Sequence, residues 1–198
     1  GGALWRYFKE EKKIEVNIYD PAKGYTNKEE INNADIIFIC VPTPFNQEKN
    51  NFDTVYVDEA LSILEDGKIV VIKSTVLPGT TAFYQKKFHQ HKFLFNPEFL
   101  TEATADKDVR EPNRQIIGYT KESEEISEVI MELLPNAPFK KIISSEEAEM
   151  VKYYNNCFYA LKVAYVNQIY DLCNKLSIDY DVVKECAKVE PMMGTNHF

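Results

Sequence analysis

The sequence lacks the features that mark secreted, redox-active and membrane proteins. Its four cysteines, Cys40, Cys157, Cys173 and Cys186, form no CxxC pair, and no secretory leader is visible. We therefore expect reduced thiols and a cytoplasmic protein. No run approaches the ~20 apolar residues that a transmembrane helix needs. Nothing in the given sequence resembles a targeting peptide, an internal repeat or a low-complexity tract, so a globular protein without membrane contact is expected.

Positive charge is scarce as well. The 23 basic residues face 31 acidic ones, which gives a net charge of −8. A surface of this sign argues against general nucleic-acid binding, although a few local cations would still hold a phosphate ligand. With 44% hydrophobic residues among 198, the composition suits one large domain, or one domain plus part of another.

Strand-like and helical patterns alternate through the first part of the chain. Strands are predicted at 14–19, 34–41, 68–74, 92–96, 114–119 and 139–144. Helices are predicted at 3–12, 54–66, 80–90 and 121–134. Continuous apolar strands between helices are typical of a parallel sheet that is covered on both faces. The pattern predicts the α/β class, with a doubly wound, mostly parallel, Rossmann-like sheet.

The alternation stops at about residue 145. Over thirty residues follow without Gly or Pro, and they predict one helix with its N-cap at Ser144 or Ser145. At ~1.5 Å per residue this helix would reach ~45–50 Å, which is too long for a helix that covers a sheet. We expect a nucleotide-binding domain at 1–143 and a central helical domain at 144–198, in which a shorter helix spans 179–189.

Two glycines stand directly before the first predicted helix. Dinucleotide-binding folds place a G-x-G-x-x-G turn there, with the pyrophosphate on the helix N-terminus. An acidic residue about 20 positions later binds the ribose hydroxyls. Gly1 or Gly2 and Asp20 have this spacing. The alternative interpretation is a cloning scar before an ordinary helix, with Asp20 as a turn residue before Pro21.

Two loops leave neighbouring predicted strands at their carboxyl ends. They read VPTP at 41–44 and KSTVLPGTT at 73–81. Ligands of open α/β sheets bind at this edge, where Thr hydroxyls and free backbone N–H groups can face a cofactor. Either loop alone could be a plain turn, but two of them on successive strands favour a binding edge.

Acid–base chemistry is suggested by two groups of polar residues. Glu98 and Glu102 lie in a polar segment, and an apolar Phe-Leu pair beside Glu98 could raise its pKa by desolvation. Lys152 and Asn156 share one face of the predicted long helix, where they would offer a cation and an amide donor to an oxyanion. The plain alternatives are a solvated loop and a surface lysine beside a polar neighbour.

Taken in order, these motifs resemble one family, the UDP-glucose/GDP-mannose dehydrogenases, which oxidise nucleotide sugars. The matching segments are the acidic residue Asp20, V-P-T-P (Val41–Pro44), K-S-T-V-x-P-G-T (Lys73–Thr80), N-P-E-F-L-x-E (Asn96–Glu102), A-x-x-D-x-x-x-P-x-R (Ala105–Arg114), A-E-x-x-K-x-x-x-N (Ala148–Asn156) and N-x-(I/L) (Asn167–Ile169). They cover nearly the whole chain in the right order, which is far more specific than any one motif.

The resemblance implies a cofactor, NAD, and a set of site residues. NAD contacts are implied for Gly1 or Gly2, Asp20, Val41, Pro42, Thr43, Ser74, Thr75 and Glu102. Substrate contacts are implied for Glu98, Phe99, Leu100, Thr101, Lys152 and Asn156. Catalysis is implied for Glu98, which handles protons through water, for Thr75, which orients that water or a neighbouring group, and for Lys152 and Asn156, which stabilise an oxyanion. No metal site is expected.

The family's reaction is the oxidation of a sugar C6 alcohol to a carboxylate by two hydride transfers to NAD, through a covalent Cys intermediate. UDP-glucose is the first substrate to expect, and a homodimer through the central helix is implied. The resemblance also predicts a fragment that is inactive as given. By this resemblance, we expect the first strand of the sheet, the nucleophilic cysteine in its G-G-x-C segment and the C-terminal UDP-binding domain to lie outside the given sequence. Met192 falls where an Arg usually contacts substrate, unless the alignment shifts by one residue.

Two other functions stay open. A β-hydroxyacid dehydrogenase of the 6-phosphogluconate type also joins a Rossmann domain to a long Lys-x-x-x-Asn helix, but its substrate loop is Gly-rich where this chain reads NPEFLTEATA. The other function is a non-catalytic nucleotide-binding or dimerisation module. It is favoured by the aromatic residues of the long helix, which are Tyr153, Tyr154, Phe158, Tyr159, Tyr165 and Tyr170.

Overall fold

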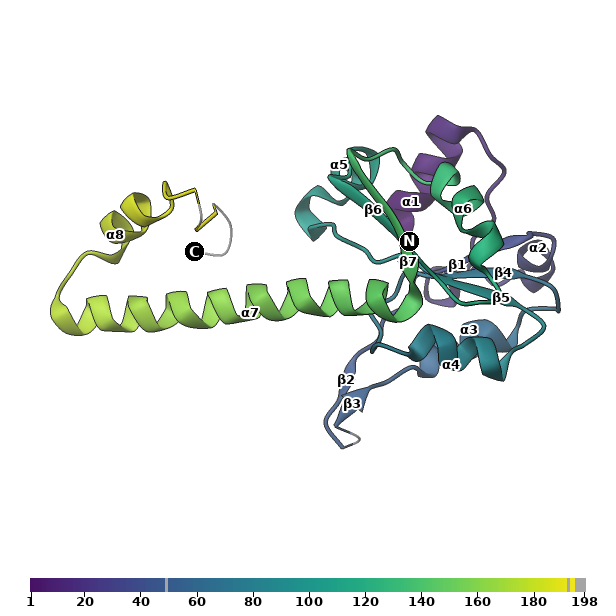
Figure 1. Ribbon diagram of the computed structural model, residues 1–198, viewed down its shortest axis with the longest axis horizontal. Helices are drawn as coiled ribbons and strands as arrows, with labels where there is room; N and C mark the ends of the chain where they lie inside the picture. The colour runs from purple at the N-terminus through teal and green to yellow at the C-terminus, as the bar shows by residue number, and fades with distance from the viewer. Residues whose placement is uncertain (49, 192, 195–198) are drawn as a thin grey trace. The chain divides into compact units, whose positions relative to one another are not determined.

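The computed structural model describes residues 1–48, 50–191 and 193–194 (Figure 1). The chain forms two compact units, Gly1–Lys152 and Tyr153–Phe198. In the first unit, helices surround a five-stranded sheet. The second unit is helical. The domain boundary expected between residues 143 and 144 stays a prediction.

A mostly parallel sheet forms the centre of the first unit. Its strands follow the order β1 (Ile36–Ile39), β4 (Ile69–Ile72), β5 (Lys92–Phe95), β6 (Arg114–Tyr119) and β7 (Phe139–Ser144). Three of the four strand pairs are parallel, whereas β6 runs antiparallel to β5. The structure confirms the predicted mostly parallel α/β sheet. The antiparallel pair was not expected, because the apolar pattern of a strand does not reveal its direction.

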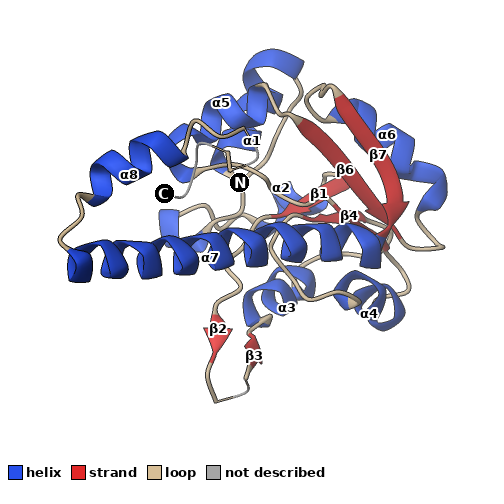
Figure 2. Cartoon of the chain, turned by 60° about the vertical axis from the view of Figure 1, so that its left-hand side comes forward, coloured by secondary structure: helices blue, strands red, loops and turns tan. Residues whose placement is uncertain are grey.

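Helices cover both faces of this sheet, as the doubly wound prediction requires (Figures 1 and 2). The α-helices of the first unit are α1 (Gly2–Tyr7), α2 (Lys28–Asn32), α3 (Val55–Ser62), α4 (Thr80–Lys87), α5 (Ala105–Arg110) and α6 (Ser127–Leu133). Helices α3 and α4 pack on one face, and α1, α5 and α6 pack on the other. Helix α1 continues as a π-helix, Phe8–Lys12, so the helix predicted at 3–12 is present in two parts.

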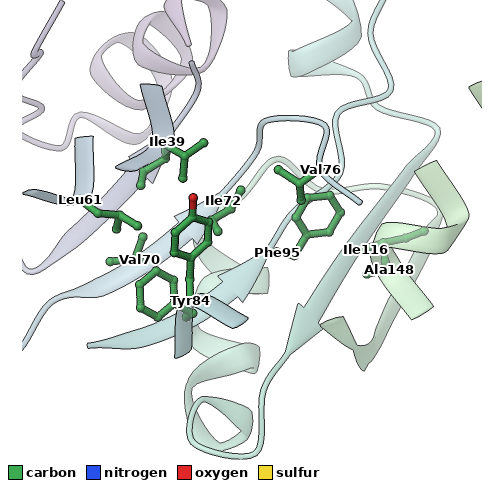
Figure 3. Packing of buried hydrophobic residues seen from close by; sticks show 11 residues of the cluster. Ile39, Leu61, Val70, Ile72, Val76, Tyr84, Phe95, Ile116 and Ala148 are labelled. Carbon is green, nitrogen blue, oxygen red and sulfur yellow. The ribbon is translucent and has the colours of Figure 1, made fainter. Parts of the chain in front are cut away.

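Each face has its own apolar core. On the first face, Leu61 of α3 and Tyr84 of α4 pack against Val70 and Ile72 of β4 (Figure 3). On the second face, α1, α5 and α6 pack against the alternate residues of the same strands. The central strands are apolar at successive positions because both of their faces are buried, and each such side chain stabilises the fold by roughly 1.5–3 kcal/mol.

The strand predicted at 14–19 does not form. Residues 13–19 have no regular structure, and Asp20 makes only an isolated bridge with Tyr25. A strand requires hydrogen bonds to a neighbouring strand. Strand β1 stands at the end of the sheet order and pairs with β4. The apolar alternation of 14–19 therefore predicted a segment that could form a strand, but it does not show whether a neighbouring strand is available to pair with it.

A small hairpin, β2 (Phe45–Asn46) and β3 (Asn51–Phe52), follows the VPTP loop, and the sequence pattern did not predict it (Figure 1). The rings of Phe45 and Phe52 meet edge to face, with their centroids 5.9 Å apart. This aromatic pair stabilises a hairpin that is otherwise only two residues long on each side.

The long helix was predicted correctly. Helix α7 spans Ser145–Leu176, 32 residues, and begins in the first unit. Its start is a capping box: the Ser144 amide donates to Glu147 Oε2 (3.0 Å), and the Glu147 amide donates to Ser144 Oγ (3.3 Å). Of the two N-caps considered, Ser144 is therefore the one used.

Gly118 of β6 permits the close approach of this helix to the sheet. A Cβ atom at Gly118 would lie 2.7 Å from Ala148 Cβ and 2.8 Å from Ser145 Cα. Both distances are shorter than a normal van der Waals contact, so only glycine leaves room for the first turn of α7. This close contact fixes the height of that turn above β6.

The second unit contains the rest of α7 and helix α8 (Tyr180–Ala187), which the pattern predicted at 179–189. Asp179 caps α8 by accepting from the amides of Asp181 (2.9 Å) and Val182 (3.4 Å). The rings of Tyr170 and Tyr180 meet edge to face at 5.2 Å. None of the helices in the described part of the chain has the length and apolar content of a membrane span.

Candidate functional site

The two loops that follow β1 and β4 are hydrogen-bonded to each other. The buried Ser74 hydroxyl accepts from the Val41 amide (2.9 Å) and donates to the Val41 carbonyl (2.7 Å). The Thr43 hydroxyl donates to the Thr75 carbonyl (2.6 Å). The VPTP and KSTV segments therefore form one braced edge at the carboxyl ends of parallel strands, where ligands of such sheets bind.

The hydroxyl of Ser74 is used by this brace, while Pro42 is exposed and Thr43 and Thr75 are half-buried. The expected NAD contacts of Val41, Pro42, Thr43, Ser74 and Thr75 stay predictions, as does the catalytic role of Thr75. What the structure adds is that these residues share one edge of the sheet.

Helix α1 begins at this same edge. A Cβ atom at Gly1 would lie 3.2 Å from Cys40 Cβ, directly after β1, so the chain passes close to that strand end. The Gly1 carbonyl accepts from the Trp5 amide (3.0 Å), which starts the helix. This position is the one that a phosphate-binding turn would occupy, and the roles of Gly1 and Gly2 stay predictions.

Asp20 lies in a turn rather than at the end of a strand. Its carboxylate pairs with Lys23 Nζ (3.0 Å), and its amide donates to the Tyr25 carbonyl (2.9 Å). The local structure therefore matches the turn that was considered as an alternative. The expected ribose contact of Asp20 stays a prediction.

Glu98 follows β5 and lies beside a buried cation. Its Oε2 is 3.2 Å from Lys73 Nζ, and its Oε1 accepts from the Phe99 amide (3.2 Å). The side chain of Lys73 is 8% exposed and that of Glu98 is 31% exposed. The carboxylate is therefore paired with a lysine.

Lys73 and Asn96 were not singled out by sequence reasoning. Lys73 Nζ donates to Asn96 Oδ1 (2.6 Å), and the fully buried Asn96 donates through Nδ2 to the Ile116 carbonyl (2.9 Å). A signal was available, because Lys73 ends the apolar run KIVVIK. A lysine that is buried with such a strand needs an acceptor or a carboxylate.

Lys152 reaches the same residue from helix α7, since its Nζ donates to the main-chain carbonyl of Glu98. Burial lowers the pKa of Lys152. Glu98 opposes this decrease, and the positive charges of Arg114 and Lys73 add to it. The structure thus brings together Glu98 and Lys152, which the sequence proposed as catalytic residues, although they are 54 positions apart.

The segment after Glu98 packs in three directions. The Arg114 guanidinium lies over the Phe99 ring, with its Cζ 3.8 Å from the ring centroid. Leu100 packs against the core beneath α1, α5 and α6. The Thr101 amide donates to Asp108 Oδ2 (2.9 Å). Arg114 Nε is buried and has no hydrogen-bond partner within the described residues. The substrate contacts expected of Phe99, Leu100 and Thr101 stay predictions.

Glu149 fastens α7 to the loop that follows β4. This fully buried carboxylate accepts from the Gly79 amide (2.6 Å), the Thr81 amide (2.8 Å) and the Thr81 hydroxyl (2.7 Å). Burial raises the pKa of Glu149, and the three donors act in the opposite direction. Glu149 stands three residues before Lys152, so this clamp holds the part of α7 that carries the lysine. Sequence reasoning missed it, because a glutamate in the first turns of a helix is usually solvated.

Three further positions were predicted from the sequence, Asn156, Glu102 and Met192. Asn156 lies in α7 within the second unit and is exposed. Glu102 begins the 3-10 helix Glu102–Thr104, and its side chain is not among those that the structure describes. Met192 lies outside the described residues. The roles expected of Asn156 and Glu102 stay predictions.

The arrangement suits proton transfer and the stabilisation of negative charge. Lys73 pairs with the Glu98 carboxylate, Lys152 donates to the Glu98 main-chain carbonyl, and Arg114 lies close enough to Lys152 to help lower its pKa. A carboxylate can accept a proton, and an ammonium group can donate to a developing oxyanion. Within the described residues, no three His, Cys, Asp or Glu side chains are grouped so that they could hold a metal ion.

Comparison with known proteins gives concordant matches over most of the chain. Residues 13–136 match the NAD binding domain of the UDP-glucose/GDP-mannose dehydrogenase family, and residues 146–198 match its central domain. The UDP-glucose 6-dehydrogenase of Rickettsia felis is 32% identical over 92% of this chain and 42% of its own length. The UDP-glucose 6-dehydrogenase TuaD of Bacillus subtilis is also 32% identical, over 91% of this chain and 42% of its own length.

Solved structures show the same likeness. A UDP-glucose dehydrogenase from Pyrobaculum islandicum superposes with a TM-score of 0.75 at 27% identity, over 99% of this chain and 51% of that one. A GDP-mannose dehydrogenase from Pseudomonas aeruginosa gives a TM-score of 0.69 at 26% identity, over 83% and 42% of the two chains. The chain therefore spans about two fifths of the length of the curated relatives it matches.

Proposed function

Because this chain belongs to the UDP-glucose/GDP-mannose dehydrogenase family, we propose that the protein containing it is a nucleotide-sugar 6-dehydrogenase. In this proposal it oxidises the C6 alcohol of the sugar to a carboxylate with NAD. The observation that carries the proposal is the hydrogen bond from Lys152 to Glu98. Alcohol oxidation needs a cation and a carboxylate close together, and this bond holds two residues of these types side by side.

NAD fits the carboxyl edge of the sheet. Gly1 approaches Cys40 without a Cβ atom between them, and the braced loops of Val41 and Ser74 lie at the same strand ends. Bound NAD would accept the hydride that leaves C6. We propose Gly1, Gly2, Asp20, Thr43 and Glu102 as further cofactor contacts.

Within the site, each residue has a distinct proposed task. Lys152, whose pKa burial lowers, donates to the oxygen that becomes negatively charged, and Asn156 supplies a second donor from α7. Glu98 moves protons through water, and Thr75 orients that water. Phe99, Leu100 and Thr101 hold the sugar. The proposal includes two hydride transfers and a covalent cysteine intermediate, with the cysteine outside this chain, so the chain alone is proposed to be inactive.

UDP-glucose is the proposed substrate, because the relatives named above are UDP-glucose 6-dehydrogenases. We place the reaction in the cytoplasm, with support from the four cysteines, which are all free thiols.

The proposed assembly is a homodimer through α7. Large apolar side chains recur at helical spacing on the described part of this helix in the second unit, and all of them are at least half exposed: Tyr154, Phe158, Leu161, Tyr165, Leu172 and Leu176. An apolar stripe of this length requires a partner surface. A second copy of α7 offers the same stripe, which a two-fold interface can pair with itself.

The function is tested by assaying the full-length protein for NADH formation with UDP-glucose, GDP-mannose, UDP-N-acetylmannosamine and 6-phosphogluconate. We expect two NADH per molecule of UDP-glucose. Oxidation of 6-phosphogluconate alone would replace the proposal by the β-hydroxyacid dehydrogenase alternative. If no substrate reacted while NAD still bound, the non-catalytic module would be supported instead.

A further inference from the structure

A buried lysine, Lys73, lies beside Glu98 at the carboxyl end of a central strand. Lys73 follows β4, whose last three residues, Val70, Val71 and Ile72, are fully buried. Its own side chain is only 8% exposed. A lysine ammonium in such a place requires partners that satisfy its charge and its donors, because an unpaired buried charge is strongly destabilising.

One partner of Lys73 is held independently of the site. Asn96 Oδ1 accepts from Lys73 Nζ at 2.6 Å. The Asn96 amide nitrogen is occupied on the other side, where it donates to the Ile116 carbonyl of β6 (2.9 Å). Because Asn96 is fully buried and bonded to the backbone of the sheet, it fixes the position of the ammonium group whether or not Glu98 is near.

The second partner is the carboxylate of Glu98, at 3.2 Å from Lys73 Nζ. Lys152 contacts the same glutamate differently, through its main-chain carbonyl. The two lysines therefore contact different groups of Glu98: Lys73 pairs with the carboxylate, and Lys152 donates to the main-chain carbonyl. A direct pair between Glu98 and Lys152 would instead neutralise both groups that the proposed reaction needs.

We infer that Lys73 is a positioning residue: held in place by Asn96, it binds the Glu98 carboxylate and thereby keeps it from pairing with Lys152. Its kinetic consequence rests on the proposed function. Lys73 does not touch the reacting atoms in this inference. It leaves the remaining ammonium protons of Lys152 to donate to the substrate oxygen. It also leaves a lone pair for proton transfer on Glu98 Oε1, which accepts one hydrogen bond from the Phe99 amide.

A measurement without substrate tests the inference separately from the function. The Lys152 ε-methylene signal of the full-length protein, assigned with Lys152→Met, is titrated by NMR in the wild type and in Lys73→Gln. Arg114, Lys73 and Glu98 are the charged groups that face Lys152. Loss of the Lys73 charge removes a repulsion and frees Glu98 to pair with Lys152, so the titration midpoint of Lys152 must rise. An unchanged midpoint overturns the inference.

The matched control is Lys68→Gln, which removes a lysine from the amino end of the same strand. Lys68 Nζ donates to the Asn32 carbonyl, away from the site. This variant must leave the Lys152 midpoint as in the wild type. A crystal structure of the wild-type full-length protein is a second test that needs no variant to fold: a Glu98 carboxylate bonded to Lys152 and not to Lys73 overturns the inference.

Kinetics then connect the inference to the reaction. Lys73→Gln is expected to lower kcat about 10-fold or more, with KM for UDP-glucose and NAD within about 3-fold of the wild type. Its pH–rate profile should also move, which a purely structural loss would not cause. Lys68→Gln should change neither quantity. A wild type that oxidises no nucleotide sugar would remove the proposed function, while the NMR titration would still decide whether Lys73 positions Glu98.

Discussion

At the scale of single residues, the least expected feature is which atoms of Glu98 the two lysines contact. Lys73 pairs with the carboxylate, and Lys152 donates to the main-chain carbonyl. The sequence could nominate Glu98 and Lys152, because their motifs have characteristic residues and spacing. It could not predict Lys73 as a neighbour of both, because that contact depends on the adjacent positions of β4 and β5 in the sheet.

The first prediction concerns Lys152. Lys152→Ala in the full-length protein should lower kcat with UDP-glucose by about 10²–10³-fold, because the donor to the developing oxyanion is lost. Steady-state NADH formation measures this effect. Lys121→Ala, which changes an exposed lysine in the loop after β6, is the control and should keep wild-type turnover. Turnover near that of the wild type in Lys152→Ala would exclude Lys152 from the chemistry.

His91 provides the second prediction, which concerns stability against pH. His91 is 2% exposed, its Nδ1 accepts from the Lys68 amide (3.2 Å), and its Nε2 is buried without a partner in the described residues. Burial lowers the pKa of His91; Asp66 opposes the decrease and Lys68 adds to it. Below the ordinary histidine pKa of about 6.5, the unfolded chain therefore binds a proton that the folded protein resists.

The free energy of unfolding should consequently fall as the pH decreases from about 6.5 toward the lower pKa of the folded protein, by at most ~1.4 kcal/mol per pH unit from this group. Urea unfolding over this pH range measures it. His91→Asn keeps an acceptor for the Lys68 amide but does not titrate, so it should reduce the pH dependence. His89→Asn, at an exposed histidine, should not alter it. An equal pH dependence in wild type and His91→Asn would contradict the prediction.

At the scale of elements, the attachment of α7 to the sheet depends on contacts that no local pattern contains. The capping box at Ser144 was readable, because its two residues are three positions apart. The space above Gly118 and the clamp of Glu149 on Gly79 and Thr81 join parts of the chain that are distant in sequence. The absence of a strand at 14–19 has the same origin: pairing is not a property of the segment itself.

The clamp leads to the third prediction. Glu149→Gln replaces one carboxylate oxygen by an NH2 group, which cannot accept from the donor it faces, either the Gly79 amide at Oε2 or the Thr81 amide and hydroxyl at Oε1. We expect a loss of about 1–3 kcal/mol in the free energy of unfolding, because a buried donor is left unsatisfied. Urea unfolding of the full-length protein measures it, and Glu132→Gln on the exposed side of α6 is the control. Equal stability of the two variants would show that the clamp contributes nothing.

At the scale of the whole molecule, the apolar stripe of α7 predicts the assembly. Phe158→Asp combined with Leu161→Asp should convert a dimer of the full-length protein into a monomer, because two buried charges would face each other across the interface. Light scattering gives the mass. Val129→Asp, at an exposed valine of α6, should leave the dimer intact. If the wild-type protein proves monomeric, or if the double variant still dimerises, the stripe is not the interface.

The sequence by itself determined the α/β class, the long helix and the ordered motifs, because strand burial, helix periodicity and capping depend on neighbouring residues. It also nominated Glu98 and Lys152. The tertiary structure alone decided the antiparallel join of β5 and β6, the unpaired segment 14–19, and the buried links of Lys73, Asn96 and Glu149. These features depend on which strands and helices become neighbours, and that choice is made by the packing of the whole chain.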